Sequence, residues 1–328
     1  MVFFITVLRA LSASIITNAH YEDIYPIRAI ANGGLVGDVL FFMISGYCLY
    51  NDKNEFSIGN FFGWYGKRLR RLYPPVIIVT LIYTIIGRYK IDGFKTFINY
   101  YLFPTFYHFI ASMVILYIPY YFISTLKALN RHLKLVILFV AIIWILLYVI
   151  AYDKSVYHID NAYEPMVRFH FMESMLIGAW FRQNDGKYRN KPVRGLPVIT
   201  LFTFVLYCFT KVLFTHRPEL SGFQFVNQLT IIAFAYCFFR VLIAYDEKLT
   251  HMPCGIKRGI SFIAGITLEI YVVQYVLIDI VIERHWPFPL NWIVVTFSIL
   301  IMATLIHWIV YGLGKLLGLL IKNRELTK

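Results

Sequence analysis

Long apolar runs recur along the whole chain, and short polar segments separate them. Most runs are close to the roughly 20 residues that a helix needs to cross the hydrocarbon core of a bilayer. They cover residues 3–20, 34–51, 73–89, 105–126, 135–152, 167–182, 195–213, 224–244, 259–282 and 290–313. The pattern predicts an all-α polytopic bundle of about ten membrane-spanning helices embedded in a lipid bilayer.

The composition agrees with a membrane protein. Of the 328 residues, 59% are hydrophobic and 15% are charged, whereas a soluble domain is typically about 25% charged. No low-complexity tract or long linker divides the chain. We therefore expect one membrane domain over residues 1–328, with no appended soluble domain. No signal-peptide cleavage site is evident, so we expect the first run to be retained as a helix.

The net charge of +13 does not indicate a nucleic-acid partner, because membrane proteins concentrate Lys and Arg on their cytoplasmic side. If the N-terminus is cytoplasmic, the inner segments carry about twice as many Lys and Arg residues as the rest of the chain. We therefore expect both termini in the cytoplasm. The four cysteines have neither metal-ligand nor disulfide spacing, and we predict no metal site.

One short basic segment, KRLRRLYP over residues 67–74, lies between two apolar runs. Each cation would cost roughly 2.5–3.5 kcal/mol at the centre of a membrane helix, so the segment lies at a membrane face or lines a polar cavity. Aromatic residues precede it, and segment 52–72 therefore predicts a short interfacial helix before the third span. A weaker interfacial helix is expected over Lys315 to Lys328.

Arg68 and Arg71 are three residues apart and share one face of a helix. Two guanidiniums on one face suit a phosphate or a carboxylate. The alternative interpretation is a topology anchor that places this segment in the cytoplasm.

The first two runs contain ionisable residues that are candidates for a site. Arg9 and His20 are separated by eleven residues, about three helical turns, and lie on roughly the same face. If the first two spans form an antiparallel hairpin, His20 and Asp38 both lie near its outer end. A carboxylate beside a histidine raises its basicity, as a general base requires. The alternative is that His20 is interfacial and Asp38 merely starts a helix.

Three motifs together resemble the acyltransferase-3 family of membrane acyltransferases. They are Arg9 followed by His20, the run GDVLFFMISGY over residues 37–47, and the basic segment KRLRRLYP. That family has an Arg and a His in its first helix, an Asp…Phe-Phe-x-x-Ser-Gly run in its second, and an Arg-x-x-Arg element entering its third. This chain has Tyr47 where Phe is frequent. It also has Gln274 where many members carry a late histidine.

The resemblance implies transfer of an acyl group, usually acetyl from acetyl-coenzyme A, to a carbohydrate hydroxyl at the bacterial cytoplasmic membrane. It implies that Arg68 and Arg71 bind the coenzyme A phosphates, with Lys67 and Arg70 adding to the positive field.

The resemblance also implies roles for the polar residues of the first two spans. His20 is then the general base, Asp38 orients it, and Arg9 binds a carboxylate or stabilises an oxyanion. Ser45 is either a hydrogen-bond donor in the acyl channel or a small residue for close helix packing.

These roles require a long path through the membrane. At 1.5 Å per residue, His20 lies about 28 Å along the first span, opposite the arginine pair. The pantetheine arm of the donor must therefore enter the bundle.

Other ionisable residues within or beside the spans are weaker candidates, which we interpret first as packed or paired polar groups. They are Glu164, Arg168, His170, Glu173, Glu269 and His307. Two other functions also fit a bundle with internal charges. One is a transporter or flippase for a lipid-linked glycan, and the other is a non-enzymatic polysaccharide export subunit.

Overall fold

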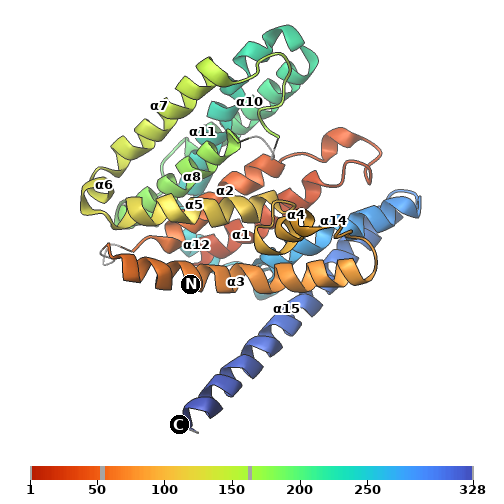
Figure 1. The fold of residues 1–328 in the computed structure, drawn as a ribbon. Coiled ribbons are helices and arrows are strands. Elements are labelled where there is room, and N and C mark those ends of the chain that lie inside the picture. The colour runs from red at the N-terminus through yellow and green to blue at the C-terminus, as the bar shows by residue number, and fades with distance from the viewer. Residues whose placement is uncertain (1, 52–55, 162–164, 327–328) are drawn as a thin grey trace.

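The computed structural model describes residues 2–51, 56–161 and 165–326, with side chains described up to residue 316. The longer helices are α1 (Phe3–Ala19), α2 (Gly34–Leu49), α3 (Ile58–Ile85), α5 (His108–Thr125), α7 (Leu133–Ala151), α8 (Val167–Gln183), α10 (Leu196–His216), α11 (Phe225–Ala244), α13 (Cys254–Gly265), α14 (Thr267–Glu283) and α15 (Leu290–Leu326). The described ranges contain no strand, which confirms the all-α prediction (Figure 1).

Short helical segments connect the long helices. They are η1 (Arg28–Ile30), α4 (Phe94–Phe97), η2 (Ile98–Leu102), α6 (Lys127–Arg131), α9 (Asp185–Tyr188), η3 (Pro218–Phe223) and α12 (Asp246–Thr250).

Each of the predicted spans falls on helical structure, but the helices differ in length and in apolar character, the two properties that a membrane-spanning helix needs. Within the described residues, six helical segments are long and apolar enough, and the bent pair α13–α14 is a seventh candidate. Helix α1 is apolar but has only 17 residues. Helices α3 and α8 carry charges. The prediction of about ten spans, like the placement of the termini, therefore stays a prediction.

The sequence predicted that the basic segment belongs to a short interfacial helix of its own. The structure shows no such separate helix in the described part of this segment. Helix α3 is continuous over 28 residues and contains the basic segment together with Pro74 and Pro75. The predicted boundary at residue 73 was wrong because the polar and apolar halves join without a break in the backbone. The cations consequently occupy the first half of a helix whose second half packs in the core.

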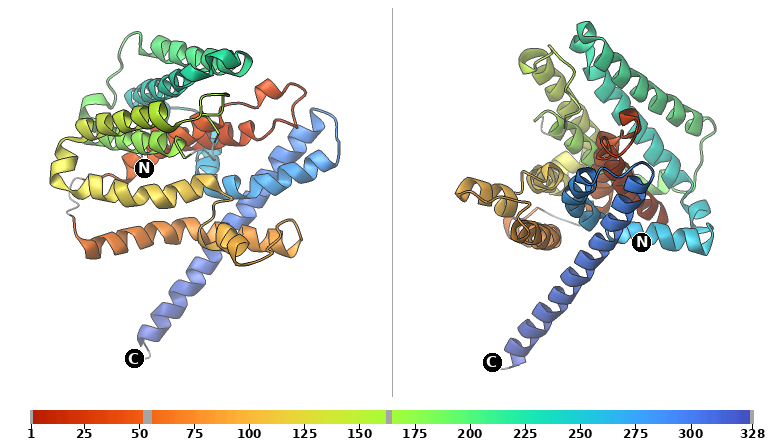
Figure 2. Two further views of the ribbon diagram at one scale, coloured as in Figure 1. Left: turned by 45° about the horizontal axis from the view of Figure 1, so that its top comes forward. Right: turned by 90° about the vertical axis from the view of Figure 1, so that its right-hand side faces the viewer.

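Two further boundaries differ from the prediction. The run at 259–282 is broken at Ile266, where α13 and α14 meet at 71°. The final basic segment continues α15 to Leu326 and is not a separate helix up to that residue. Figures 1 and 2 show the end of α15 projecting away from the other helices.

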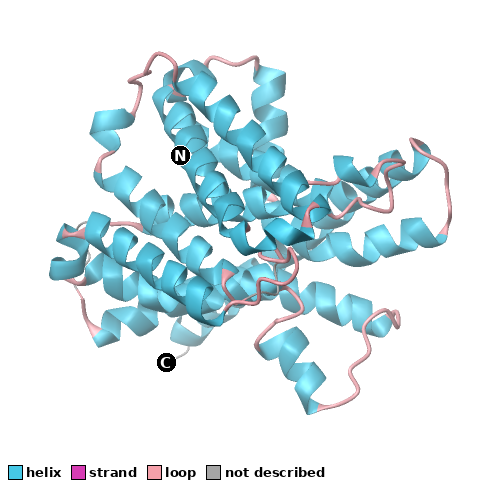
Figure 3. Ribbon diagram, turned by 90° about the horizontal axis from the view of Figure 1, so that it is seen from above, coloured by secondary structure: helices cyan, strands magenta, loops and turns pink. Residues whose placement is uncertain are grey.

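Helix α2 lies at the centre of the bundle and packs most extensively against α8. Two glycines bring the helices together. A Cβ on Gly46 would lie 1.8 Å from the carbonyl oxygen of Met175, and one on Gly178 would lie 1.9 Å from that of Met43. Helices α7, α10 and α15 lie at the periphery, since only about a fifth of the residues in the most apolar stretch of each is buried (Figures 1 and 2). Figure 3 shows the same bundle of helices and connecting loops from above.

A polar cluster fixes the beginning of α1 to the neighbouring chain segments. Asp246 Oδ1 accepts a hydrogen bond from the Phe4 backbone N–H at 2.8 Å, and its Oδ2 pairs with Arg189 at 3.0 Å. Arg189 also pairs with Asp185 at 2.8 Å, and Asp185 accepts a hydrogen bond from Tyr47 at 2.6 Å. The cluster connects α1, α2, α9 and α12 at one end of the bundle. We name it the Arg189 cluster.

Candidate active site

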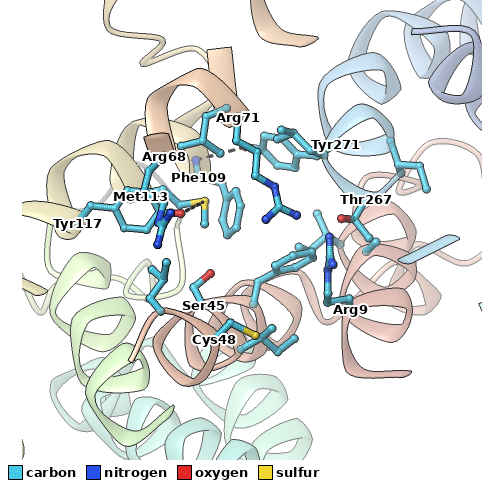
Figure 4. Close-up of a pocket in the computed structure, with 18 of the residues that line it drawn as sticks. Arg9, Ser45, Cys48, Arg68, Arg71, Phe109, Met113, Tyr117, Thr267 and Tyr271 are labelled. Carbon is cyan, nitrogen blue, oxygen red and sulfur yellow. Dashed lines mark hydrogen bonds between the residues drawn. The ribbon is translucent and has the colours of Figure 1, made fainter. Parts of the chain in front are cut away.

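A cavity of about 300 Å³ lies between α1, α2, α3, α5 and α14, and we name it the inner cavity. Its lining consists of Arg9, Ala13, Ile16, Thr17, Phe41, Ile44, Ser45, Cys48, Leu49, Lys67, Arg68, Arg71, Leu72, Phe109, Met113, Tyr117, Thr267, Leu268, Ile270 and Tyr271. Helices α1 and α3 provide the cations, whereas α5 and α14 provide mainly apolar and aromatic walls (Figure 4). The cavity is therefore an apolar channel with a cluster of positive charge.

Three arginines from two helices reach this cavity. Arg9 extends from α1, and Arg68 and Arg71 extend from α3 (Figure 4). Arg68 lies over the Trp64 ring at 5.0 Å, and its Nε atom is buried without a hydrogen-bond partner. None of the three has an ion-pair partner in the part of the chain that the structure describes. Like charges held together without a counterion repel one another, so the arrangement suits an anionic ligand.

A second, wider cavity of about 1040 Å³ adjoins the inner cavity, and we name it the outer vestibule. Both cavities share Cys48, Leu49, Lys67 and Arg68 in their linings. The remaining vestibule residues are largely polar and include Asn60, Arg182, Gln183 and Asp185. A polar vestibule that narrows into an apolar channel matches a ligand with a charged head and a thin, less polar arm.

The structure brings together five of the predicted site residues. Arg9, Ser45, Lys67, Arg68 and Arg71 all line the inner cavity. Arg70 lines neither cavity, because it lies on the other side of α3. Arg70 therefore adds to the positive potential of the cavities only from a distance, without lining either of them.

The two alternatives for the Ser-Gly pair apply to different residues. Ser45 lines the inner cavity. Gly46 lies at the contact with α8, where its missing Cβ permits the close approach of the two backbones.

His20 lies beyond the inner cavity, at the end of α1. Its ring contacts Tyr275 of α14 edge-on, with the ring centroids 5.0 Å apart. One turn earlier, Thr17 lines the cavity and donates a hydrogen bond to Gln274 Oε1 at 2.8 Å. Gln274, which stands where many family members carry a histidine, thus lies between the cavity and His20.

The sequence suggested that Asp38 pairs with His20, but the structure shows no such pair. Its side chain is 6% exposed, and Oδ1 has no hydrogen-bond partner in the described structure. Neither a hydrogen bond nor an ion pair joins Asp38 to His20. Asp38 interacts electrostatically with Tyr271, whereas His20 contacts Tyr275, one turn further along α14. The two residues therefore face the same helix at successive turns.

Several buried polar atoms lie on helices that line the inner cavity. Ser12 Oγ, Ser112 Oγ and Gln274 Nε2, like Asp38 Oδ1, have no hydrogen-bond partner among the described residues. Leaving such a group unsatisfied costs about 1–3 kcal/mol. Helices α1, α2, α5 and α14 thus each carry a buried polar atom that is available to a polar ligand or to water.

Most of the residues that form the cavity walls were not predicted from the sequence. Phe109, Met113 and Tyr117 of α5 gave no signal, because they are apolar residues within an apolar run. Tyr271 of α14 was likewise not predicted to line a cavity. Its hydroxyl accepts a hydrogen bond from the Phe109 N–H at 3.3 Å and so joins two walls of the cavity.

The weaker candidates among the described residues lie outside both cavities. His170 lies 3.7 Å from Glu173 and contacts the Trp144 ring edge-on at 4.5 Å. Arg168, at the start of the same helix, lines neither cavity. Glu164 lies outside the described residues.

Glu269 and His307 join α14 to α15. The Glu269 side chain lies 2.9 Å from His307 Nδ1 and is buried. It also interacts electrostatically with Arg9. This pair therefore supports a cavity wall without lining the cavity.

Comparisons with known proteins agree with this geometry. The family model described as an acyltransferase domain matches residues 2–312. No curated protein and no solved structure matches the chain significantly. The match covers nearly the whole chain, including the helices that form both cavities. A multi-pass helical membrane protein with this match belongs to the acyltransferase-3 family.

Proposed function

We propose that the protein is an O-acyltransferase of the bacterial cytoplasmic membrane. It transfers acetyl from acetyl-coenzyme A to a hydroxyl of a cell-surface or lipid-linked polysaccharide. The observation that carries the proposal is the group of three arginines that line the inner cavity and have no ion-pair partner among the described residues; one of them, Arg68, also lines the outer vestibule. Coenzyme A combines phosphates with a thin pantetheine arm, and this shape and charge match the two cavities.

The vestibule receives the nucleotide end of the donor. Lys67 and Arg68 line both cavities, so they contact phosphate at the point where the ligand narrows. Arg71 and Arg9 lie further along the inner cavity. Arg9 and His20 are about 16 Å apart along α1, which favours a role for Arg9 on the donor rather than on an oxyanion beside His20.

The chemistry takes place at the far end of the inner cavity. His20 accepts the proton of the acceptor hydroxyl as the oxygen attacks the thioester carbonyl carbon. The new C–O ester bond forms, the C–S bond breaks, and coenzyme A leaves as a thiolate that takes up the proton from the imidazolium. Asp38 is a positioning residue in this proposal, since it acts on His20 through groups between them rather than by direct contact.

The test measures transfer of labelled acetyl from acetyl-coenzyme A to glycan in membranes, alongside coenzyme A binding by purified protein. We expect His20→Ala to abolish transfer and to retain coenzyme A binding. We expect Arg68→Ala/Arg71→Ala to lose binding, whereas Arg70→Ala, a matched control on the same helix, retains it. Transfer that survives His20→Ala at equal protein level refutes the catalytic assignment. A glycan transporter or export subunit predicts no coenzyme A binding at all.

A further inference from the structure

A third cavity, of about 340 Å³, lies between α14 and α15, near the end of α14 and the beginning of α15. Its walls are apolar and include Leu277, Ile280 and Val281 from α14 and Val294 from α15. None of these residues lines the inner cavity or the outer vestibule. This α14–α15 slot is therefore separate from the site described above.

The surface around the slot is apolar and exposed. Ile293 and Phe297 of α15 are 41% and 61% exposed, as expected for a helix that faces lipid. Protein interiors and membranes pack without large voids, and an apolar slot offers water no partners. The apolar chain of a membrane lipid is thus the natural occupant.

Polar groups line the slot where α14 ends. Arg284 and Trp286 line it there, directly after α14. The adjacent carboxylate, Glu283, is already engaged by two hydrogen bonds from Arg88, at 2.6 and 2.8 Å. The Glu283 carboxylate accordingly raises the pKa of Arg88.

Arg284 has no ion-pair partner within the described ranges. A guanidinium without an ion-pair partner, lining an apolar slot together with an indole ring, suits the phosphate of a lipid.

We propose that the α14–α15 slot binds a polyprenyl phosphate, a lipid with one long apolar chain on one phosphate. The chain lies between the two helices, and the phosphate contacts Arg284. One slot and one unpaired cation match one chain and one phosphate, whereas a phospholipid carries two chains. In the acyl transfer reaction, the bound lipid is the carrier of the acceptor glycan. That second statement rests on the proposed function, but the binding itself does not.

The position of the slot relative to His20 supports this role. Nine residues of α14 separate Arg284 from Tyr275, the ring that contacts His20, and they span about 14 Å. The chain after Arg284 lies against the segment that follows His20, because Asn291 Nδ2 donates a hydrogen bond to Ile24 O at 2.8 Å. In this proposal a glycan attached to the phosphate begins about 14 Å along α14 from the residue that contacts His20, and it extends toward His20.

The test is native mass spectrometry of the full-length protein with undecaprenyl monophosphate. We expect retention of this lipid and a roughly five- to tenfold weaker affinity for Arg284→Gln, the effect of removing one cation near a lipid phosphate. Lys90→Gln is the matched control, because Lys90 is an exposed cation in the loop after α3 that does not line the slot. Val294→Phe, which fills the slot, is expected to weaken binding while leaving Arg284 in place.

Competing lipids decide the identity of the ligand. Undecaprenol, which lacks the phosphate, and dioleoyl phosphatidic acid, which has two chains, are both expected to bind more weakly. Equal binding of either lipid, or unchanged binding by Arg284→Gln, overturns the proposal. Coenzyme A binding is measured on the same preparations and is expected to be unaffected by Arg284→Gln. The two measurements thereby distinguish failure of the proposed coenzyme A site from failure of the proposed lipid site.

Discussion

The inner cavity concentrates positive charge where the membrane would otherwise exclude it. Arg9, Arg68 and Arg71 come from two helices and share no carboxylate partner among the described residues. Intramembrane cations are costly unless they face a polar cavity or a ligand. The reaction that we propose uses these charges for the donor, and reserves the polar groups near His20 for the acceptor.

The thiol of Cys48 tests donor binding directly, because Cys48 lines both the inner cavity and the outer vestibule. In a Cys254→Ser background, coenzyme A is expected to slow maleimide labelling of Cys48 at least several-fold, measured by mass spectrometry. Cys254 is exposed and lines neither cavity, so in a Cys48→Ser background its labelling is expected to be unaffected. Equal labelling of Cys48 with and without coenzyme A contradicts a donor path through this junction.

Asp38→Asn retains the shape of the side chain and removes its charge. If Asp38 positions the groups around His20, we expect the turnover rate to fall about tenfold or more, as for other residues that support a general base. Coenzyme A affinity is expected to stay unchanged, because Asp38 does not line the inner cavity. Turnover and binding are measured on the same preparation, and a parallel loss of both indicates misfolding instead.

At the scale of the helices, the site depends on how closely α2 approaches α8. Gly46 follows Ser45 directly, so the packing of one residue sets the position of the other. A Cβ at Gly46 meets the backbone of Met175, which has no flexible side-chain end that could move aside. Helix α2 thus presents Ser45 and Cys48 to the cavity only because Gly46 permits the contact behind them.

Gly46→Ala is expected to destabilise the protein by about 1–3 kcal/mol or more, the usual cost of overpacking a core. Thermal unfolding in detergent measures the effect as a lower midpoint. Gly66→Ala on α3 is the control, since a Cβ there meets nothing within 4 Å. Equal midpoints for the two variants would show that the α2–α8 contact is looser than described.

At the scale of the whole molecule, the Arg189 cluster connects chain segments that are far apart in sequence. It joins Asp246 to the Phe4 backbone and Asp185 to Tyr47, and so holds the start of α1 beside the end of α2. Arg9 follows Phe4 by little more than one turn of α1. The cluster therefore helps to place the Arg9 side chain beside the arginines of α3.

Arg189→Ala leaves Asp185 and Asp246 without their shared partner. We expect a loss of about 1–3 kcal/mol in stability, below the cost of breaking a fully buried pair, because the Arg189 side chain is 24% exposed. Arg194→Ala is the matched control, since Arg194 is exposed and belongs to no ion pair in the described part of the chain. Thermal unfolding measures both variants, and a similar loss for Arg194→Ala removes the special role of the cluster.

The sequence by itself determined the helical membrane class and the family motifs. Apolar runs of about 20 residues leave few alternatives to membrane helices, since a chain in lipid must satisfy its backbone hydrogen bonds internally. The sequence also predicted which residues of one helix share a face, because a helix places residues three or four apart on the same side. For this reason Arg68 and Arg71 were expected on one face of a helix, and both line the inner cavity. In the same way, α1 carries Arg9 and His20 about three turns apart.

Only the tertiary structure decided which residues from different helices meet. Arg9 joins Arg68 and Arg71, whereas His20 contacts Tyr275 and forms no bond with Asp38. The apolar residues of α5 became cavity walls, and α13 and α14 became a bent pair. These outcomes depend on helix rotation and crossing, which are set by close contacts such as Gly46 against Met175. Apolar periodicity does not encode such contacts when nearly every face of a membrane helix is apolar.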